Sequence, residues 1–477
     1  MSTLRTRLSR HFGDTVGVQP EANRRGDSRG PLAPASKESP RRGTPEPGPL
    51  GPLERLRRLH PTPAWADESG SEVRGPSVFV PPRRVDPLRP VTLAPSLELE
   101  EVRVAGTQCL AGSVCLSSGV MHGGRRLDEG LRLNGATAEL LSGDMRLGEF
   151  DVTRAAFFDL ETSGLLGGSG NVAFLSGFAQ IDARGAVSMH QVLIRHPTEE
   201  PAALSLITDL LEGVDFLVSF NGKSFDRNVL ADRFVMNRMN PSRVLDLPHV
   251  DLLHPSRRLF RGLLESCSLS AIEEELLAVH RHESEVRGAE VPQRWFDYLR
   301  GGSVQLLEPV IEHNVLDVLS LVTLAGLLGA CVDAPGLFLP QPRAQIALSR
   351  LLIERGDGHR AEELLRLLGR GQADDPIVYS ALGLLAGCLR RSGRFEEAVA
   401  VWMRMIEAAG ASDLEPWLGA MITLEHRLRR PHRALELIEE VLAGLDKGGL
   451  WRTELPALHH RRARLRRKTS RSKSGHP

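Results

Sequence analysis

Two acidic residues at the end of an apolar run are the first candidates for chemistry in this 477-residue sequence. In the run Phe157-Phe-Asp-Leu-Glu-Thr-Ser-Gly164, a strand would point Asp159 and Glu161 to the same face. Two carboxylates crowded beside large apolar residues are costly unless they are protonated or neutralised, and a bound cation is the common remedy. Oxygen ligands without a nearby Cys or His pair favour Mg²⁺ or Mn²⁺ over zinc. The alternative is a strand end with two solvated acids, and this segment alone does not decide between them.

A third acid follows another apolar run. The strand-like segment 216–220 is followed by a turn that contains Asn221 and Lys223, and then by Asp226, which opens a predicted helix. Asp226 either is a helix-terminal acid that favours the helix dipole or reaches over the strand ends, where open α/β sheets carry their ligands. Lys223, one of only five lysines, either meets a phosphate at the rim of such a site or is a solvated turn residue.

A fourth acid lies on an apolar helix that is predicted after Pro309. From residue 310 to 322 the sequence is apolar around most of the helix, and the polar exceptions His313, Asp317 and Ser320 fall on one stripe. A charged Asp on a buried helix needs a partner. His313, one turn earlier, either simply satisfies Asp317 or belongs with it to a site.

The elements that must position these residues form a predicted α/β domain over residues 151–332. Three strand-like segments between residues 155 and 194 precede the strand at 216–220, and helical segments alternate with strands after it. This order predicts a mixed sheet with flanking helices. Residues 96–150 alternate apolar and small polar residues around Gly-rich breaks, and we expect a short β-rich lead-in to the domain there.

The rest of the chain falls into a polar arm and a helical module. Residues 1–95 are rich in Pro, Arg, Gly and Ser and are predicted to be a disordered arm. Residues 337–460 have an all-helical pattern. A small residue recurs there at a spacing close to the roughly 34-residue period of tetratricopeptide repeats, at Ala361, Ala398 and Ala434. A plain helical bundle is the alternative.

Composition limits the class of protein. With 60 basic and 60 acidic residues, no bulk charge attracts a polyanion, so any nucleic-acid site must be local. The basic tail, residues 461–477, either touches phosphate or is solvated. Five scattered cysteines predict neither a zinc site nor a disulfide framework. The first residues lack the apolar stretch of a signal peptide, and acidic and polar residues break the longest apolar run, so we expect a cytoplasmic protein without membrane contact.

Taken together, the acidic segments resemble the DEDD exonuclease superfamily within the RNase H-like fold. The motifs that carry the resemblance are Asp159-x-Glu161-Thr-Ser-Gly164, Asn221-x4-Asp226 and His313-x3-Asp317. More narrowly, the Asn-Gly-Lys-x-Phe-Asp turn, the Cys267-x-Leu269 helix start and the His-Asn-x-x-Asp helix look like the YprB-type RNase H-like exonuclease domain. The resemblance covers roughly residues 100–330 and leaves the tetratricopeptide-like repeats as a separate module.

This resemblance implies a metal-dependent 3′–5′ exonuclease acting on single-stranded DNA or RNA. Two Mg²⁺ or Mn²⁺ ions about 4 Å apart would clamp an in-line displacement, with Asp159, Glu161, Asp226 and Asp317 as their ligands. The best-known members carry a general base as His five residues, or as Tyr four residues, before the last Asp. His313 has the tyrosine spacing, and because histidine titrates near neutral pH it is the candidate to orient or deprotonate the attacking water.

A further set of residues is expected to contact the nucleic acid: Thr162, Asn221, Lys223, Arg257 and Arg258, with Arg261 beside the last two. Trp295 or Phe296 would stack on a base if they are not core residues, which is the commoner role. A different class of function is an adaptor, in which the RNase H-like domain binds nucleic acid without cutting it and the repeats recruit a protein partner. The complete set of four acids favours the nuclease.

Overall fold

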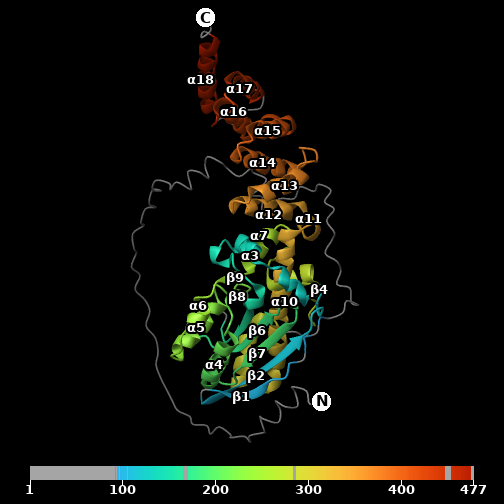
Figure 1. The fold of residues 1–477 in the computed structure, drawn as a ribbon, viewed down its shortest axis with the longest axis vertical. Helices are drawn as coiled ribbons and strands as arrows, with labels where there is room; N and C mark the ends of the chain where they lie inside the picture. Colours follow the sequence, from blue (N-terminus) through green and yellow to red (C-terminus); the bar gives the residue numbers. More distant parts are fainter. Residues whose placement is uncertain are drawn as a thin grey trace, which may run out of the picture. The chain divides into compact units, whose positions relative to one another are not determined.

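A computed structural model of the chain describes residues 92, 94–95, 97–104, 106–164, 170–282, 286–445 and 453–473. The predicted arm therefore lies outside the described residues, apart from residues 92 and 94–95. The described part contains an α/β domain with a mixed sheet, followed by a region that is helical throughout (Figure 1). The predicted fold class is confirmed.

One seven-stranded sheet organises the domain. In spatial order its strands are β1 (Glu100–Val104), β2 (Thr107–Leu116), β7 (Val187–Leu193), β6 (Ala173–Ile181), β5 (Ala155–Thr162), β8 (Phe216–Ser219) and β9 (His249–Asp251). Neighbours from β1 to β5 pair antiparallel, whereas β5 pairs with β8, and β8 with β9, in parallel. The parallel strands bring their carboxyl ends to one edge of the sheet, where the acids at the ends of β5 and β9 lie.

The segment predicted as a β-rich lead-in is part of the same sheet. Its strands β1 and β2 extend the sheet beyond β7, with Leu110 opposite Leu193 in the β2–β7 register. A second, two-stranded sheet joins β3 (Met121–His122) to β4 (Arg125–Arg126). The remainder of the segment is helical, and the 3-10 helix η2 (Leu127–Arg132) packs against α10.

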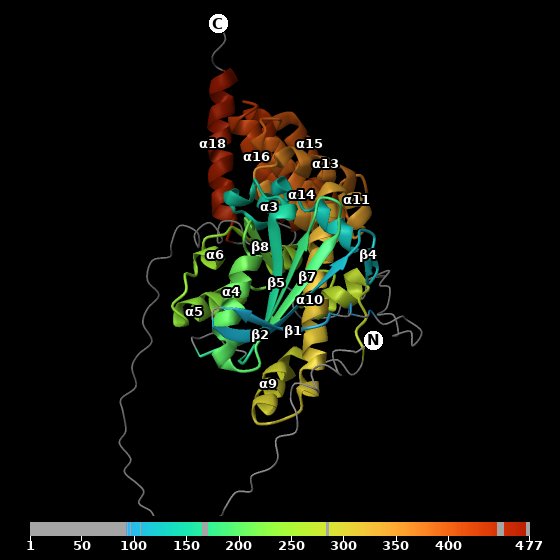
Figure 2. The same ribbon diagram turned by 60° about the horizontal axis from the view of Figure 1, so that its bottom comes forward.

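The long helix α10 (Glu308–Asp333) packs against β5 and β6. Pro309 in its first turn suits a helix start, because proline lacks the N–H that would remain unbonded there. By length and composition this helix would be long enough to cross a membrane, and 94% of its apolar window is buried inside the domain. Its apolar character is therefore explained by packing against the sheet and η2. Figures 1 and 2 show α10 running along the sheet.

Helices α4 (Glu200–Leu210) and α5 (Asp226–Met236) contact each other, and a buried ion pair joins them. Arg233 donates from Nε to one carboxylate oxygen of Glu200 at 2.7 Å and from Nη2 to the other at 2.6 Å. Such a bidentate pair fixes geometry as well as charge. It holds α5, whose first residue is Asp226.

Shorter helices connect these elements. The α-helices are α3 (Gly135–Ser142), α6 (Ser242–Leu245), α7 (Leu253–Phe260), α8 (Leu269–Ile272), α9 (Val291–Leu299) and α11 (Pro335–Phe338). A π-helix, η6 (Glu273–Leu277), follows α8. The remaining 3-10 turns are η3 (Met145–Leu147), η4 (Val152–Arg154), η5 (Pro197–Glu199), η7 (Gly288–Glu290), η8 (Val304–Leu306) and η9 (Gly410–Ser412).

After α11 the described chain is a series of helices in which each packs against the next. They are α12 (Pro342–Glu354), α13 (Gly358–Leu368), α14 (Pro376–Arg391), α15 (Phe395–Ala409), α16 (Glu415–His426), α17 (Pro431–Leu445) and α18 (Leu455–Lys473). The recurrent alanines Ala361, Ala398 and Ala434 are all fully buried. Small side chains at these positions let neighbouring helices approach closely.

Helix α18 spans the beginning of the predicted basic tail and is anchored by one acid. Glu425 of α16 has a fully buried side chain, and it accepts hydrogen bonds from Arg464 at 2.6 Å, Lys468 at 3.2 Å and Arg461 at 3.4 Å. Several cations of the tail are thus partners of the protein itself.

Replacing Glu425 by Ala should loosen α18, because three partly buried cations lose their common counter-charge. We expect the free energy of unfolding, measured by urea denaturation, to fall by about 2 kcal/mol. The control Glu439→Ala removes an exposed partner of Arg466 and should change stability by less than about 1 kcal/mol. Equal losses in the two variants would rule out Glu425 as the anchor.

Candidate active site

Asp159 and Glu161 lie on β5, between β6 and β8. Their side chains share one face of the strand, as the two-residue period requires, and it is the face on which α10 packs, since Asn314 and His313 of that helix approach them. The β5–β6 register shifts between Glu161 and Thr162. Regular pairing with β6 therefore extends past Asp159 and ends directly after Glu161.

Asn314 of α10 holds the first acid in place. Its Nδ2 donates to the carboxylate Oδ2 of Asp159 at 3.1 Å and to the carbonyl oxygen of the same residue at 3.2 Å. Its own Oδ1 accepts from Nε2 of Gln191 at 3.0 Å. Asn314 and Gln191 are fully buried. Gly177, opposite Asp159 on β6, makes room for the amide, because a Cβ there would lie 2.1 Å from Asn314 Oδ1.

The substitution Gly177→Ala should therefore displace Asn314 and release Asp159. Because the clash involves a buried, hydrogen-bonded amide, we expect a loss of about 1–3 kcal/mol in unfolding free energy. Gly170→Ala is a matched control, since a Cβ at Gly170 meets nothing within 4 Å. If both variants unfold at the same urea concentration, Gly177 has no such role.

Asp226 is the first residue of α5 and is only 6% exposed. The turn before it is braced by Asp251 at the end of β9, which accepts from the backbone N–H of Asn221 at 2.8 Å and of Lys223 at 3.3 Å. Asn221 has a left-handed backbone with φ 67°, a conformation that Asn tolerates better than most residues. The sequence reasoning missed Asp251, although an acid at the end of a strand-like segment is the same signal that Asp159 gives.

His249 contacts the end of β8, the strand that leads into the same turn. Its Nε2 lies 2.8 Å from Oγ of Ser219, the last residue of β8, and the ring packs 5.6 Å from that of Phe158. Burial lowers the pKa of His249 from 6.5 to about 3. The folded protein therefore contains the neutral ring.

This low pKa predicts a pH-dependent loss of stability. Below pH 6.5 His249 is protonated in the unfolded chain but stays neutral in the folded protein. The contribution of His249 to the free energy of unfolding is therefore complete above pH 6.5 and is lost as pH falls toward 3. Between pH 7.5 and pH 5, wild type should lose about 2 kcal/mol more unfolding free energy than His249→Gln. Identical pH profiles for the two proteins in urea denaturation would contradict this assignment.

His313 and Asp317 lie one turn apart on α10. His313 Nε2 is 3.6 Å from Asp317 Oδ2 and 4.0 Å from Glu161 Oε1, so the helix brings the histidine to the acids of β5. Arg281 places Nη1 3.0 Å from His313 Nδ1. A guanidinium can only donate, so Nδ1 accepts, and a neutral His313 carries its proton on Nε2, toward the acids.

Arg281 is the functional residue that the sequence reasoning missed most completely. It lies outside every helix and strand, shortly after η6, and forms ion pairs with both Asp317 and Glu273. Glu273 is 1% exposed. Neither residue carried a periodic or motif signal, because a loop arginine and a helical glutamate are ordinary in sequence.

The four predicted acids lie close enough that the charge of one shifts the pKa of another. Burial raises the pKa of Asp159 well above its usual value, and the charges of Asp317, Asp226 and Glu161 raise it further. Burial also raises the pKa of Glu161 to about 7, against the opposing charge of His313. Burial, with the charge of Glu161 next in importance, raises the pKa of Asp226 to about 7. The structure thus brings together acids from β5, α5 and α10.

The donor set of this cluster fits a hard divalent cation. Four carboxylates that disfavour one another's charge are the ligands that Mg²⁺ or Mn²⁺ prefers, and a cation would relieve their repulsion. Among the described residues, no three acidic, histidine or cysteine side chains already surround one point as ligands. The guanidinium of Arg281 instead ion-pairs with Asp317. The side chains would therefore reorient around an ion.

The residues predicted to contact nucleic acid have different surroundings. Thr162 donates from Oγ1 to the carbonyl of Gly164 at 2.7 Å. Asn221 is exposed and Lys223 is half-buried, both in the turn that Asp251 braces. Thr162 ends the same strand that carries Asp159 and Glu161.

The arginines in and directly after α7 differ in their surroundings. Arg258 pairs with Glu354 of α12 at 2.7 Å, whereas Arg257 and Arg261 are exposed. Trp295 is 1% exposed and stacks on Phe174 with ring centroids 4.5 Å apart, so the base-stacking role is wrong for Trp295, which is a core residue.

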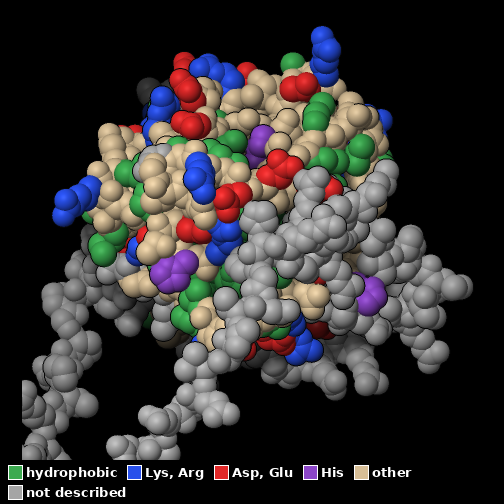
Figure 3. Space-filling model, turned by 90° about the horizontal axis from the view of Figure 1, so that it is seen from below, with side chains coloured by type: hydrophobic (Ala, Val, Ile, Leu, Met, Phe, Trp, Pro, Cys, Tyr) green, Lys and Arg blue, Asp and Glu red, His purple; other side chains and the backbone are tan. Residues whose placement is uncertain are grey.

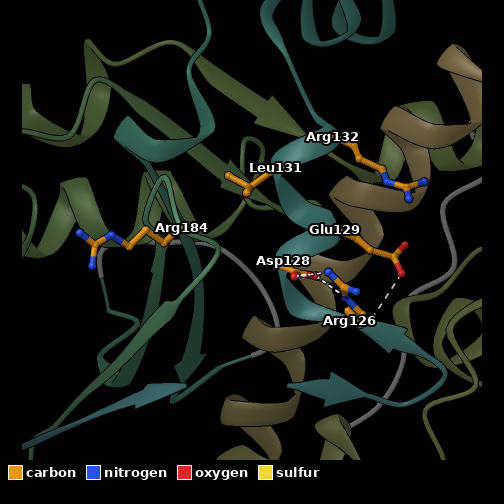
Figure 4. Close-up of a pocket in the computed structure, with 6 residues that line it drawn as sticks. All are labelled: Arg126, Asp128, Glu129, Leu131, Arg132 and Arg184. Atoms are coloured by element: carbon orange, nitrogen blue, oxygen red, sulfur yellow. Dashed lines mark hydrogen bonds and ion pairs between the residues drawn. The ribbon is translucent and has the colours of Figure 1, made fainter. Parts of the chain in front are cut away.

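A separate hollow of about 320 Å³ lies away from the carboxylate cluster. Its lining residues are Arg126, Asp128, Glu129, Leu131, Arg132 and Arg184 (Figure 4). Arg126 is neutralised by Asp128 at 2.5 Å, and Arg132 and Arg184 point away from each other. On the face seen in Figure 3, described basic and acidic side chains are interspersed. Neither feature forms a concentrated basic site.

Comparison with known proteins defines the class that the fold and the acids indicate. Residues 156–329 match the RNase_H superfamily, and they contain β5 from its second residue, β6 to β9, α5 and most of α10. The domain therefore belongs to the RNase H superfamily and has a nuclease-like fold.

A relative defines the family more narrowly. An uncharacterized protein, YprB of Bacillus subtilis (strain 168), is 31% identical over 321 residues, which cover 66% of this chain and 75% of that protein. The chain belongs to the YprB family. Among solved structures, the family B DNA polymerase from the hyperthermophilic archaeon Pyrobaculum calidifontis matches with a TM-score of 0.28 and 14% identity. That match covers 53% of this chain and 29% of the polymerase chain, and this likeness is too low to bear on function.

Proposed function

We propose that this protein is a DEDD-type exonuclease that hydrolyses single-stranded nucleic acid from its 3′ end with two Mg²⁺ or Mn²⁺ ions. The observation that carries the proposal is the cluster of Asp159, Glu161, Asp226 and Asp317, in which burial and mutual repulsion raise the pKa of the first three. Membership of the RNase H superfamily supports a nuclease. Buried carboxylates that repel one another are stabilised in this arrangement by a bound cation.

Each acid has its own role in this proposal. Asp159, fixed by Asn314, would hold the ions together with Glu161, Asp226 and Asp317. Bound divalent ions supply charge neutralisation and an activated water in such reactions. The turn braced by Asp251 sets the position of Asp226.

His313 is proposed to orient the attacking water or to accept its proton. In the structure its Nε2 faces the acids and Nδ1 accepts from Arg281. Acting as a base at Nε2 would require Arg281 to withdraw from Nδ1, so that the proton can reside there instead. Alternatively, Arg281 stays bonded to Nδ1. In that case His313 donates from Nε2 to the attacking water or to a carboxylate, and it orients that group without accepting a proton.

The proposed path for the nucleic acid begins at the turn next to the acids. Lys223 and Asn221 stand in this turn, and Thr162 ends the strand that carries two of the acids. We propose that they contact the phosphate backbone, with exposed Arg257 farther along. Arg258 would contribute only if it leaves Glu354.

The proposal predicts metal-dependent release of nucleotides from single-stranded DNA or RNA. Asp159→Asn and Asp317→Asn should each lower kcat by at least about 10²-fold, because each removes a charged ligand. Asp209→Asn, an exposed acid on α4, is the matched control and should keep full activity. The assay uses 5′- and 3′-labelled oligonucleotides with Mg²⁺, with Mn²⁺ and with chelator.

Two outcomes would contradict the nuclease. One is a wild-type protein that is inactive on DNA and RNA with either metal, and the other is full activity of both Asn variants. Loss of the 5′ label before the 3′ label would contradict only the proposed polarity.

The helical region supports a second proposal from a different class. Buried alanines recur on α13, α15 and α17, as in tetratricopeptide-like repeats that bind protein partners. An adaptor would bind oligonucleotide and a protein without cutting. Calorimetry that shows oligonucleotide binding but no Mg²⁺ or Mn²⁺ binding would favour the adaptor over the nuclease. Either function is proposed to operate in the cytoplasm.

A further inference from the structure

Arg281 reaches the carboxylate cluster from a segment that the rest of the fold holds firmly. The backbone N–H of Gly124, in the β3–β4 turn, donates to the carbonyl of Leu277 at 2.7 Å. Thr92 donates to the carbonyl of His280 at 2.7 Å and accepts from its N–H through Oγ1 at 3.2 Å. The residue directly before Arg281 is thereby fixed on both its backbone polar groups.

One carboxylate buttresses the Arg281 guanidinium. Glu273 accepts from Nε at 2.9 Å and from Nη2 at 2.5 Å, so the two groups meet edge to edge. Ser320 of α10 donates to the same carboxylate at 2.5 Å, and His122 Nε2 lies 2.8 Å from Ser320 Oγ. Glu273, Ser320 and His122 are each at most 2% exposed. A chain of buried polar groups from three elements thus fixes one edge of the guanidinium.

The other part of the guanidinium faces the acids. Nη2 pairs with Asp317, and Nη1 lies 3.0 Å from Nδ1 of His313. Because Glu273 already balances the charge of Arg281, the contact with Asp317 is an additional one. An anionic oxygen that took the place of the Asp317 carboxylate would meet the same pre-oriented donors.

We propose that Arg281 is a phosphate-binding residue of this active site, held by Glu273 so that the edge that contacts Asp317 and His313 in the structure meets a nonbridging oxygen of the nucleic-acid backbone once Asp317 serves as a metal ligand. The inference rests on the nuclease function proposed above. Arginine suits the role better than lysine, since its planar fork can engage Glu273 and a phosphate at the same time.

A purely structural Arg281 would behave differently. If Arg281 served only to neutralise Asp317 and Glu273, its removal would lower stability and alter metal affinity. Phosphate affinity would then change only as a consequence of the altered metal affinity. A phosphate-binding Arg281 competes with metal for Asp317. Its loss should therefore leave metal binding intact or tighter while phosphate binding weakens.

The test compares Arg281→Gln and Arg281→Lys with Arg184→Gln, an exposed arginine in the β6–β7 turn. Calorimetry first measures Mn²⁺ affinity, and then the affinity of the Mn²⁺-saturated protein for a nucleoside 5′-monophosphate, the product of the proposed reaction. The kcat/KM on the oligonucleotide that wild type cleaves, and the melting temperature, complete the set.

Arg281→Gln should bind Mn²⁺ at least as tightly as wild type, bind the nucleotide about 10-fold more weakly and lose about 10²-fold in kcat/KM. Arg281→Lys, which keeps the charge and guards against a folding defect in the Gln variant, should recover part of the nucleotide affinity. Arg184→Gln should match wild type in every measurement.

Nucleotide affinity within twofold of wild type in folded Arg281→Gln, or a parallel loss of Mn²⁺ affinity, would overturn the inference and leave the nuclease in place. A wild-type protein that hydrolyses no oligonucleotide overturns the proposed function and this inference together.

Discussion

Repulsion among buried carboxylates is the constraint around which this domain is arranged. Asp159, Glu161 and Asp226 have raised pKa values because burial and neighbouring acids both disfavour their charged forms. A buried carboxylate without a compensating charge destabilises the fold that buries it. The sheet nevertheless brings them together, since β5 carries two of them, and α5 and α10 each deliver one more. A positive charge beside these carboxylates would relieve their repulsion and so stabilise the fold.

Buried hydrogen bonds and an ion pair keep two of the acids, Asp159 and Asp226, in position. Asn314, itself held by Gln191, fixes Asp159, and the absence of a side chain at Gly177 allows that contact. Asp251 braces the turn before Asp226 through backbone N–H groups. Helix α5 is tied to α4 by a bidentate ion pair. Such positioning of Asp159 and Asp226 is typical of a site that must meet a ligand with defined geometry.

The sequence was informative where periodicity or order decides the structure. Alternation on β5 placed Asp159 and Glu161 on one face, the apolar pattern after Pro309 predicted the buried helix α10, and the strand order predicted the mixed sheet. The resemblance to the RNase H superfamily and to the YprB family is confirmed. The assignment of metal ligands stays a prediction.

Features that depend on contacts between distant segments were out of reach of sequence patterns. Arg281 meets both Glu273 and Asp317 only because its loop and the π-helix η6 fold back on α10. The pairing of Arg258 with Glu354 joins α7 to α12, and nothing in either helix alone predicts it. The sequence pattern does not distinguish a core role from a nucleic-acid contact for Trp295, whereas its burial and its stacking on Phe174 identify a core residue. Strands β1 and β2 were expected as a lead-in, but whether they would join the main sheet depends on pairing with β7.

Anomalous diffraction from crystals of the wild-type protein grown with Mn²⁺ is the most direct test of whether the carboxylate cluster binds divalent ions. We expect two manganese peaks about 4 Å apart, both within ligand distance of Asp159, with the Asp317 carboxylate turned from Arg281 toward an ion. Crystals that show no manganese at these acids, with Arg281 still paired to Asp317, would contradict this expectation.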